Sequence, residues 1–282
     1  MGGMTIHPIS GALGAELRDL DLARLDDGLF ADIHRALLEY SVVFFRDQDI
    51  TPEQQIAFAN RFGGIHYHPY IEGMADHPEI VQVIKTETDT YNFGGGWHTD
   101  QMFSERPASL TMLYAHQVPA AGGDTMYSSM YAAYESLSER MKSLISELRT
   151  INLGDTPNHR SGMSRAQRYQ HAKGIKMRAN APEGPAEVVH PLVRVHPETG
   201  RKALYIGGHS HFFEGMTAEE SAPLIGFLKN HAVRPEFTCR FRWQPGAMAI
   251  WDNRCTQHNA INDYQGSRRE MHRITIEGDR PV

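Results

Sequence analysis

Short apolar segments separated by turn residues are spread along this chain, and their distribution limits the folds that it can adopt. One segment alternates apolar and polar residues, as expected for a half-buried strand, and the turn at 196–200 joins two others into a predicted hairpin. Strands dispersed in this way do not suggest a regular βαβ series and instead favour a β-barrel or sandwich decorated by helices. The candidate strands are residues 41–45, 110–114, 192–195, 202–206, 237–243, 248–251 and 273–276.

Helical patterns gather near the front of the chain and in the connections between strands. Two of them open with a capping box, in which a threonine precedes a glutamine or glutamate by three positions. One of these two also has proline at its first turn, and it is expected to stop near Gly63. The predicted helices begin at Asp26 or Asp27, at Thr51, at Met130 (running to about Leu148) and at Thr217.

Composition excludes several classes of protein. A length of 282 residues with 40% hydrophobic residues is enough for a sizeable core. The net charge of -6 argues against a nucleic-acid partner, and no apolar run is long enough to cross a membrane. Only Cys239 and Cys255 are present, so a disulfide framework is not expected, and the first residues lack the pattern of a secretory signal. We therefore expect a soluble protein of the cytoplasm.

A possible metal site is the strongest functional signal. His98 and Asp100 stand two positions apart, so both side chains point to one face of an extended segment. His258 supplies a second imidazole from a distant part of the chain. Two histidines and one carboxylate leave half of an octahedral metal open, as in non-haem Fe(II) oxygenases, although these ligands also suit catalytic zinc.

Two arginines near the C-terminus extend this pattern. Arg269 and Arg273 are four positions apart, so they face the same side of a terminal strand. A guanidinium binds a carboxylate through two parallel hydrogen bonds, which suits it to an anionic co-substrate. A lone histidine or arginine is more often structural, but the joint spacing favours a functional site.

Several motifs resemble the taurine dioxygenase/2,4-dichlorophenoxyacetate dioxygenase family, whose members are Fe(II)- and 2-oxoglutarate-dependent oxygenases. The resemblance covers nearly the whole chain. It implies a single dioxygenase domain over residues 1–282 that is mostly β with helical decorations, folded as a double-stranded β-helix (a jelly roll, as in cupins). The motifs are Gly11–Ala15, Val43–Gln48, Trp97–Asp100, Gly122–Thr125, Trp251–His258, Arg268–Arg273 and Gly278-Asp279.

The resemblance implies a role for each residue of the cofactor site. His98, Asp100 and His258 would bind Fe(II). Arg269 would pair with the distal carboxylate of 2-oxoglutarate, and Thr125 would donate a hydroxyl to the same group. By family chemistry, 2-oxoglutarate and O2 are consumed, succinate and CO2 are released, and a substrate C–H bond is hydroxylated. Desaturation or ring formation is the alternative outcome of the same cofactor chemistry.

The resemblance is less specific about the substrate. Arg273 and His68 match positions that meet the anionic group of the substrate, and Gly94 replaces an asparagine of the substrate pocket. A structural salt bridge at Arg273 and a structural histidine at His68 are the alternatives. We expect a small anionic substrate, namely a sulfonate, a sulfate ester, an aryloxy-carboxylate or a natural-product acid.

Competing interpretations stay open at this point. A zinc hydrolase or a non-catalytic jelly roll that binds a small acid would use some of the same residues. A Rossmann dehydrogenase is excluded because Gly94–Gly96 does not continue as G-x-G-x-x-G. The irregular segment near 155–185 is either an active-site lid or a solvated surface excursion. By family analogy we expect a homo-oligomer, either a dimer or a tetramer.

Overall fold

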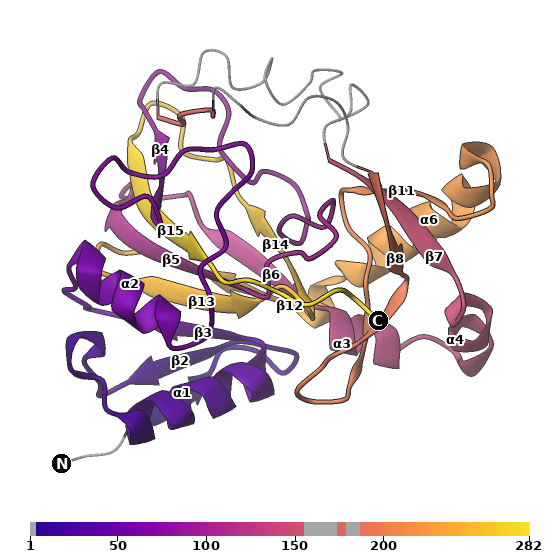
Figure 1. Ribbon diagram of the computed structural model, residues 1–282, viewed down its shortest axis with the longest axis horizontal. Helices are drawn as coiled ribbons and strands as arrows, with labels where there is room; N and C mark the ends of the chain where they lie inside the picture. Colours follow the sequence, from indigo (N-terminus) through magenta and orange to yellow (C-terminus); the bar gives the residue numbers. More distant parts are fainter. Residues whose placement is uncertain (1–3, 155–173, 179–186) are drawn as a thin grey trace.

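The computed structural model describes residues 4–154, 174–178 and 187–282, and in these ranges it is rich in strands (Figure 1). The largest sheet has seven strands in the order β1-β2-β3-β13-β5-β15-β4. β2 and β3 are parallel, and the other neighbours are antiparallel. The strands of this large sheet are β1 (Thr5–Pro8), β2 (Ala15–Arg18), β3 (Val42–Phe45), β4 (Val81–Lys85), β5 (Leu110–Gln117), β13 (Met248–Asp252) and β15 (Arg269–Thr275).

A smaller antiparallel sheet lies against the large one and closes the core between them. Its order is β12-β6-β14, formed by Thr238–Phe241, Thr125–Ser129 and Thr256–Ala260. Inward-facing side chains from both sheets belong to one buried cluster, in which the rings of Phe44 and Phe241 stack with their centroids 4.1 Å apart. The described residues are therefore mostly β with helical decorations, as the pattern of dispersed strands predicts.

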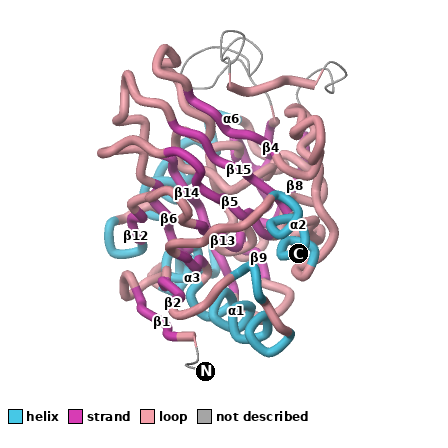
Figure 2. The backbone as a smooth tube through the Cα atoms, turned by 90° about the vertical axis from the view of Figure 1, so that its left-hand side faces the viewer, coloured by secondary structure: helices cyan, strands magenta, loops and turns pink. Residues whose placement is uncertain are grey.

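Two helices cover the outer face of the large sheet. The helix α1 (Asp27–Tyr40) is capped by the side chain of Asp26, and α2 (Pro52–Asn60) begins at the capping box of Thr51 and Gln54, as the sequence predicts. A short 3-10 helix, η1 (Leu22–Arg24), precedes them. The apolar faces of α1 and α2 pack on this outer face in a second core cluster. Figure 2 shows the strands of the large sheet side by side, with these helices beside them.

The remaining described elements form a group at one end of the sandwich, with a third core cluster. The expected hairpin is present as β9 paired with β10. The single helix expected near 130–148 is wrong: the chain forms two helices, because Ser136 ends the first and Ser138 caps the second. The elements are α3 (Met130–Glu135), α4 (Glu139–Ile145), β7 (Arg149–Leu153), β8 (Glu187–Pro191), β9 (Val193–Val195), β10 (Lys202–Leu204), β11 (Ser210–Phe213), α6 (Ala218–Ala232) and η2 (Pro235–Phe237).

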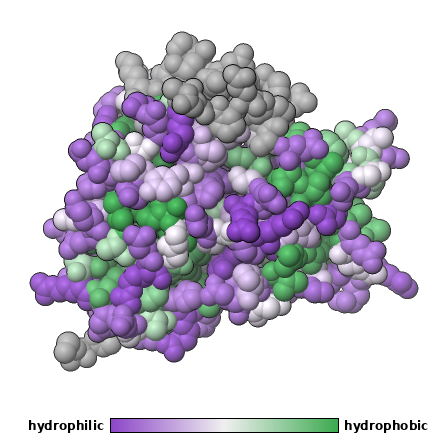
Figure 3. All heavy atoms as spheres, viewed as in Figure 1, coloured by the Kyte–Doolittle hydropathy of each residue, from purple (hydrophilic) through white to green (hydrophobic). Residues whose placement is uncertain are grey.

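The segment proposed as a lid, 155–185, lies outside the described residues except for 174–178. Within that short stretch, Ile175 and Met177 contact the core between the sheets, and Met177 pairs with Ile71. Polar side chains cover most of the face drawn in Figure 3, with apolar residues in scattered areas. Among the described helices, none combines the length and apolar character that crossing a membrane requires.

Candidate active site

Backbone pairing brings the two predicted histidine ligands together. His98 and His258 form an isolated antiparallel bridge, in which each backbone N–H donates to the other residue's carbonyl, at 3.0 and 2.8 Å. His258 belongs to β14, while His98 lies in the loop after Gly94–Gly96. The pairing fixes both Cα positions, so the two imidazoles lie side by side with ring centroids 4.2 Å apart.

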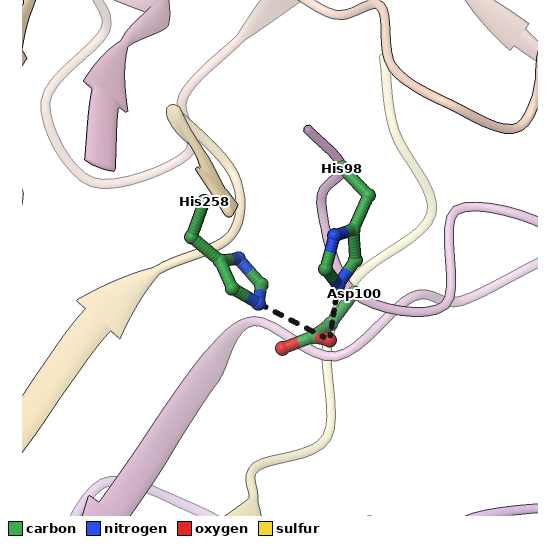
Figure 4. A group of neighbouring side chains, drawn as sticks. All are labelled: His98, Asp100 and His258. Atoms are coloured by element: carbon green, nitrogen blue, oxygen red, sulfur yellow. Dashed lines mark ion pairs between the residues drawn. The ribbon is translucent and has the colours of Figure 1, made fainter. Parts of the chain in front are cut away.

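Asp100 completes the group. Its Oδ1 lies 3.7 Å from His98 Nε2 and 3.8 Å from His258 Nε2, and Figure 4 shows the three side chains pointing toward one another. One donor atom from each residue falls within 4.8 Å of the other two. The three predicted ligands therefore converge, and the donor set of two imidazoles and one carboxylate fits Fe(II).

The local environment prepares these groups to bind a cation. His98 Nδ1 lies 2.9 Å from the carbonyl oxygen of Gly96. A carbonyl can only accept, so Nδ1 carries the proton and Nε2 keeps its lone pair in the neutral ring. Burial, together with the neighbouring His98, lowers the pKa of His258 to about 3, so that imidazole is neutral near pH 7. Burial alone would raise the pKa of Asp100, but the Arg273 guanidinium, the two neighbouring imidazoles and the hydrogen bond from Thr111 outweigh it and hold this pKa well below its usual range.

Two residues that the sequence analysis did not identify hold Asp100 in place. Thr111, on β5, donates its hydroxyl to Asp100 Oδ2 at 2.6 Å. Asn253, in the turn between β13 and β14, donates to the Thr111 hydroxyl at 2.9 Å and accepts from the Asp100 backbone N–H at 3.3 Å. Trp251 Nε1 donates to the same Asn253 oxygen at 3.0 Å. The only signal in the sequence is that Trp251 and Asn253 belong to the motif that ends in His258.

The structure places Arg273 next to the metal donors. Its Nη2 lies 2.9 Å from Asp100 Oδ1, and both side chains are buried. The contact is an ion pair without the alignment of a hydrogen bond, since Nη2 has no hydrogen-bond partner. The Arg273 guanidinium carbon also lies 5.7 Å from the centre of the Phe93 ring. Arg273 therefore lies beside Asp100 within the candidate site.

Arg269 is a buried cation with unsatisfied donors. Its side chain points to the interior between the sheets, only 5% of the residue is exposed, and neither Nε nor Nη2 has a hydrogen-bond partner. Burial lowers the pKa of its guanidinium, which shows that the charge is poorly compensated. An unpaired buried guanidinium destabilises the folded protein unless an anion binds to it. This arrangement fits a carboxylate ligand.

Thr125 lies beside this cation and has a hydroxyl proton available. Trp243 Nε1 donates to Thr125 Oγ1 at 2.9 Å, and the Arg269 guanidinium carbon lies 5.7 Å from the Trp243 ring centre. Because Oγ1 accepts the indole N–H, its own proton can be donated elsewhere. Arg269 and Thr125 can together bind one carboxylate.

His68 and Gly94 both lie close to the candidate site. His68 is buried, its Nδ1 accepts from the Tyr70 backbone N–H at 3.1 Å, and its ring centroid lies 6.3 Å from that of Phe93. A Cβ atom at Gly94 would lie 3.4 Å from His98 Cε1, and the φ of Gly94 is 78°, which favours glycine. Gly94 therefore leaves room beside a metal ligand.

A second group of possible ligands, His196, Asp252 and Cys255, is already satisfied by protein contacts. Asp252 accepts two hydrogen bonds from the Arg254 guanidinium, at 2.8 and 2.6 Å, and lies 3.0 Å from His196 Nε2. Burial raises the pKa of the Cys255 thiol to about 12. These residues form an ion-pair network that supports the turn after β13 and do not resemble a metal site.

Comparisons with known proteins agree with this geometry. The family model described as "Taurine catabolism dioxygenase TauD, TfdA family" matches residues 5–275. The chain belongs to this family. It is a 2-oxoglutarate-dependent dioxygenase, as the resemblance of its motifs implies. Membership of the family disfavours the zinc hydrolase and the non-catalytic binding module.

Individual relatives extend over almost the whole chain. An alpha-ketoglutarate-dependent sulfate ester dioxygenase of Pseudomonas putida is 33% identical over 283 residues, covering 99% of this chain and 91% of the relative. The alpha-ketoglutarate-dependent 2,4-dichlorophenoxyacetate dioxygenase of Cupriavidus pinatubonensis is 33% identical over 301 residues, with 98% of each covered. A crystal structure of a taurine dioxygenase from Burkholderia xenovorans has a TM-score of 0.82 and 35% identity, covering 100% of this chain and 93% of that one.

Proposed function

We propose that this dioxygenase binds Fe(II) through His98, Asp100 and His258 and hydroxylates a C–H bond of a small organic acid. The observation that carries the proposal is the convergence of these three donors beside an unpaired, buried Arg269. Iron, when bound, supplies the activation of O2 that is coupled to conversion of 2-oxoglutarate to succinate and CO2. The chain's own residues position the reactants and exclude water.

The second element of the proposal is the 2-oxoglutarate site. Arg269 and Thr125 would hold the distal carboxylate, while the other end of the molecule would face the three metal donors. Both residues have hydrogen-bond donors that lack protein acceptors, as argued above. A crystal structure of a relative with 28% identity and a TM-score of 0.78 contains Mn(II) and N-oxalylglycine, a ligand with the same two terminal carboxylates.

The substrate is proposed to carry a sulfonate, sulfate ester, aryloxy-carboxylate or other acid group. Arg273 and His68 both lie close to the ring of Phe93, and we assign the acid group to this pair. Gly94 leaves space for the rest of the substrate next to His98. Relatives named for sulfate esters, phenoxypropionate and 2,4-dichlorophenoxyacetate support this class of substrate.

The proposal also covers the fold, the cellular location and the oligomeric state. We assign the two facing sheets to a double-stranded β-helix, or jelly roll, because their antiparallel strands enclose one core that contains the site. A cytoplasmic location is supported by two buried cysteines that form no disulfide. A homo-oligomer is proposed by analogy with the family, and sedimentation equilibrium would test it.

Substrate-dependent succinate formation tests the proposed function. Purified protein would be given Fe(II), ascorbate, 2-oxoglutarate and a panel of sulfonates, alkyl sulfates and aryloxy acids. We expect at least one acid to stimulate both succinate formation and O2 consumption, and we expect Asp100→Ala to abolish both. Succinate formation that persists in Asp100→Ala would refute the metal site.

A further inference from the structure

A buried tyrosine hydroxyl faces the same interior as the cofactor residues. Tyr127 lies on β6, the central strand of the small sheet, and none of the residue is exposed to solvent. Its hydroxyl makes no hydrogen bond of normal geometry. A buried hydroxyl without a partner destabilises a fold, so its presence calls for an explanation.

Its surroundings place this phenol between the metal donors and Arg269. Tyr127 is the cross-strand partner of His258, and their rings are stacked with centroids 6.3 Å apart. Burial has the largest effect on the pKa of this hydroxyl; Cys239 and Asp100 also raise it, and Arg269 lowers it. The neighbouring Thr125 hydroxyl also lowers that pKa. Thr125 and Tyr127 stand two positions apart on β6 and are both buried, so their side chains face the same side of the sheet. Thr125 bonds to Trp243, and the Arg269 guanidinium lies over the ring of that tryptophan.

We infer that the Tyr127 hydroxyl donates a hydrogen bond to the distal carboxylate of 2-oxoglutarate, alongside Arg269 and Thr125. This inference depends on the proposed function of the site. Three hydrogen-bond donors would then share one acceptor group: the Arg269 guanidinium, the Thr125 hydroxyl and the Tyr127 hydroxyl. A carboxylate has about four lone-pair positions, so it can accept from all of them.

The alternative is that the hydroxyl is purely structural. Its ring already packs well, since it contacts Phe44 and Trp251 with centroid distances of 5.5 Å in both cases. Phenylalanine would preserve that packing and remove only the oxygen. A structural hydroxyl would stabilise the protein without ligand, whereas a ligand-binding hydroxyl would not. The two roles therefore predict opposite effects of Tyr127→Phe on the ligand-free protein.

The experiment compares Tyr127→Phe with a matched control. Tyr205 is also buried with an unpartnered hydroxyl, but its ring lies over Arg194 outside the cofactor site. Binding of 2-oxoglutarate to the Mn(II)-loaded protein would be measured by calorimetric titration, and the melting temperature would be measured without ligands. We expect Tyr127→Phe to weaken 2-oxoglutarate binding about tenfold or more, without lowering the melting temperature. Tyr205→Phe should leave the affinity unchanged.

Oxalate provides a test of which carboxylate is contacted. It can chelate the metal but has no distal carboxylate, so it should bind the wild type and Tyr127→Phe equally. Unchanged 2-oxoglutarate affinity, a lower melting temperature, or an equal loss of oxalate binding would each overturn the inference. If the wild type itself failed to bind 2-oxoglutarate, the proposed function would be wrong. If the wild type bound 2-oxoglutarate and Tyr127→Phe bound it equally well, only the role of Tyr127 would be wrong.

Discussion

Replacing Thr111 with valine tests how the protein holds Asp100, the carboxylate that we propose as a metal ligand. Thr111 is fully buried on β5. Its hydroxyl donates to Asp100 Oδ2 at 2.6 Å and accepts from Asn253 Nδ2 at 2.9 Å. Valine has nearly the same shape, so Thr111→Val removes both hydrogen bonds while it preserves the packing.

The expected magnitude follows from these two bonds. A hydrogen bond to a charged group contributes about 1.5–3 kcal/mol, and a buried amide left without an acceptor costs about 1 kcal/mol more. We therefore expect Thr111→Val to lower the free energy of unfolding by roughly 2.5–4 kcal/mol. For a chain of this size, that corresponds to a fall in melting temperature of about 4–7 °C. Mutating a residue that orients a metal ligand typically weakens metal binding about 10–100-fold, so the affinity of Thr111→Val for Fe(II) should fall by a similar factor.

Thr111→Ser is the matched control because serine keeps the hydroxyl and loses only a methyl group. Anaerobic equilibrium dialysis with Fe(II) and differential scanning calorimetry would be applied to both variants. We expect the serine variant to retain nearly all of the wild-type iron affinity. The reasoning would be refuted if Thr111→Val bound iron as tightly as the wild type, or if the two variants lost affinity equally.

Three further predictions concern charges in and around the site. Arg269→Leu should weaken 2-oxoglutarate binding by about 100-fold or more without destabilising the ligand-free protein, and retained tight binding in a calorimetric titration would contradict the assignment. Arg273→Ala should raise the KM for the acidic substrate while uncoupled 2-oxoglutarate turnover persists, and an unchanged KM would exclude a role in substrate binding. Acid should destabilise the fold because the pKa values of three buried histidines are lowered from 6.5, to about 3 for His258 and about 4 for His190 and His272. As the pH falls below 6.5, these three histidines become protonated in the unfolded chain before they do so in the folded protein. The free energy of unfolding should therefore decrease between pH 6.5 and 4, by up to about 4 kcal/mol per pH unit. Urea-unfolding measurements that gave the same free energy of unfolding at every pH in this range would contradict this prediction.

The convergence of the three candidate metal ligands could be predicted from the sequence because the spacing of residues in a strand determines which side chains share a face. A two-residue spacing in an extended segment is sufficient to bring His98 and Asp100 to one face. The motif around His258 and the arginine spacing supplied the other members of the site. Helices with clear capping residues were predicted for the same reason, since a cap depends only on neighbours in the sequence.

The supporting residues could not be predicted because they depend on tertiary contacts. Thr111 and Asn253 meet Asp100 only when β5 and the turn after β13 are brought together in the fold. The strands β6 and β14 were missed because their inward-facing residues include polar side chains, such as Thr125 and His258, which interrupt the apolar pattern of a buried strand. The tertiary structure is likewise needed to show that the buried hydroxyl of Tyr127 has no hydrogen-bond partner.

Iron binding without oxygen tests the central claim most directly. Equilibrium dialysis of the wild type and of Asp100→Ala, each with and without 2-oxoglutarate, would give the stoichiometry and affinity of Fe(II). We predict one ion per wild-type chain, bound more tightly when 2-oxoglutarate is present, and little or no binding to Asp100→Ala. Equal iron binding by the two proteins, or no binding by the wild type, would contradict the account.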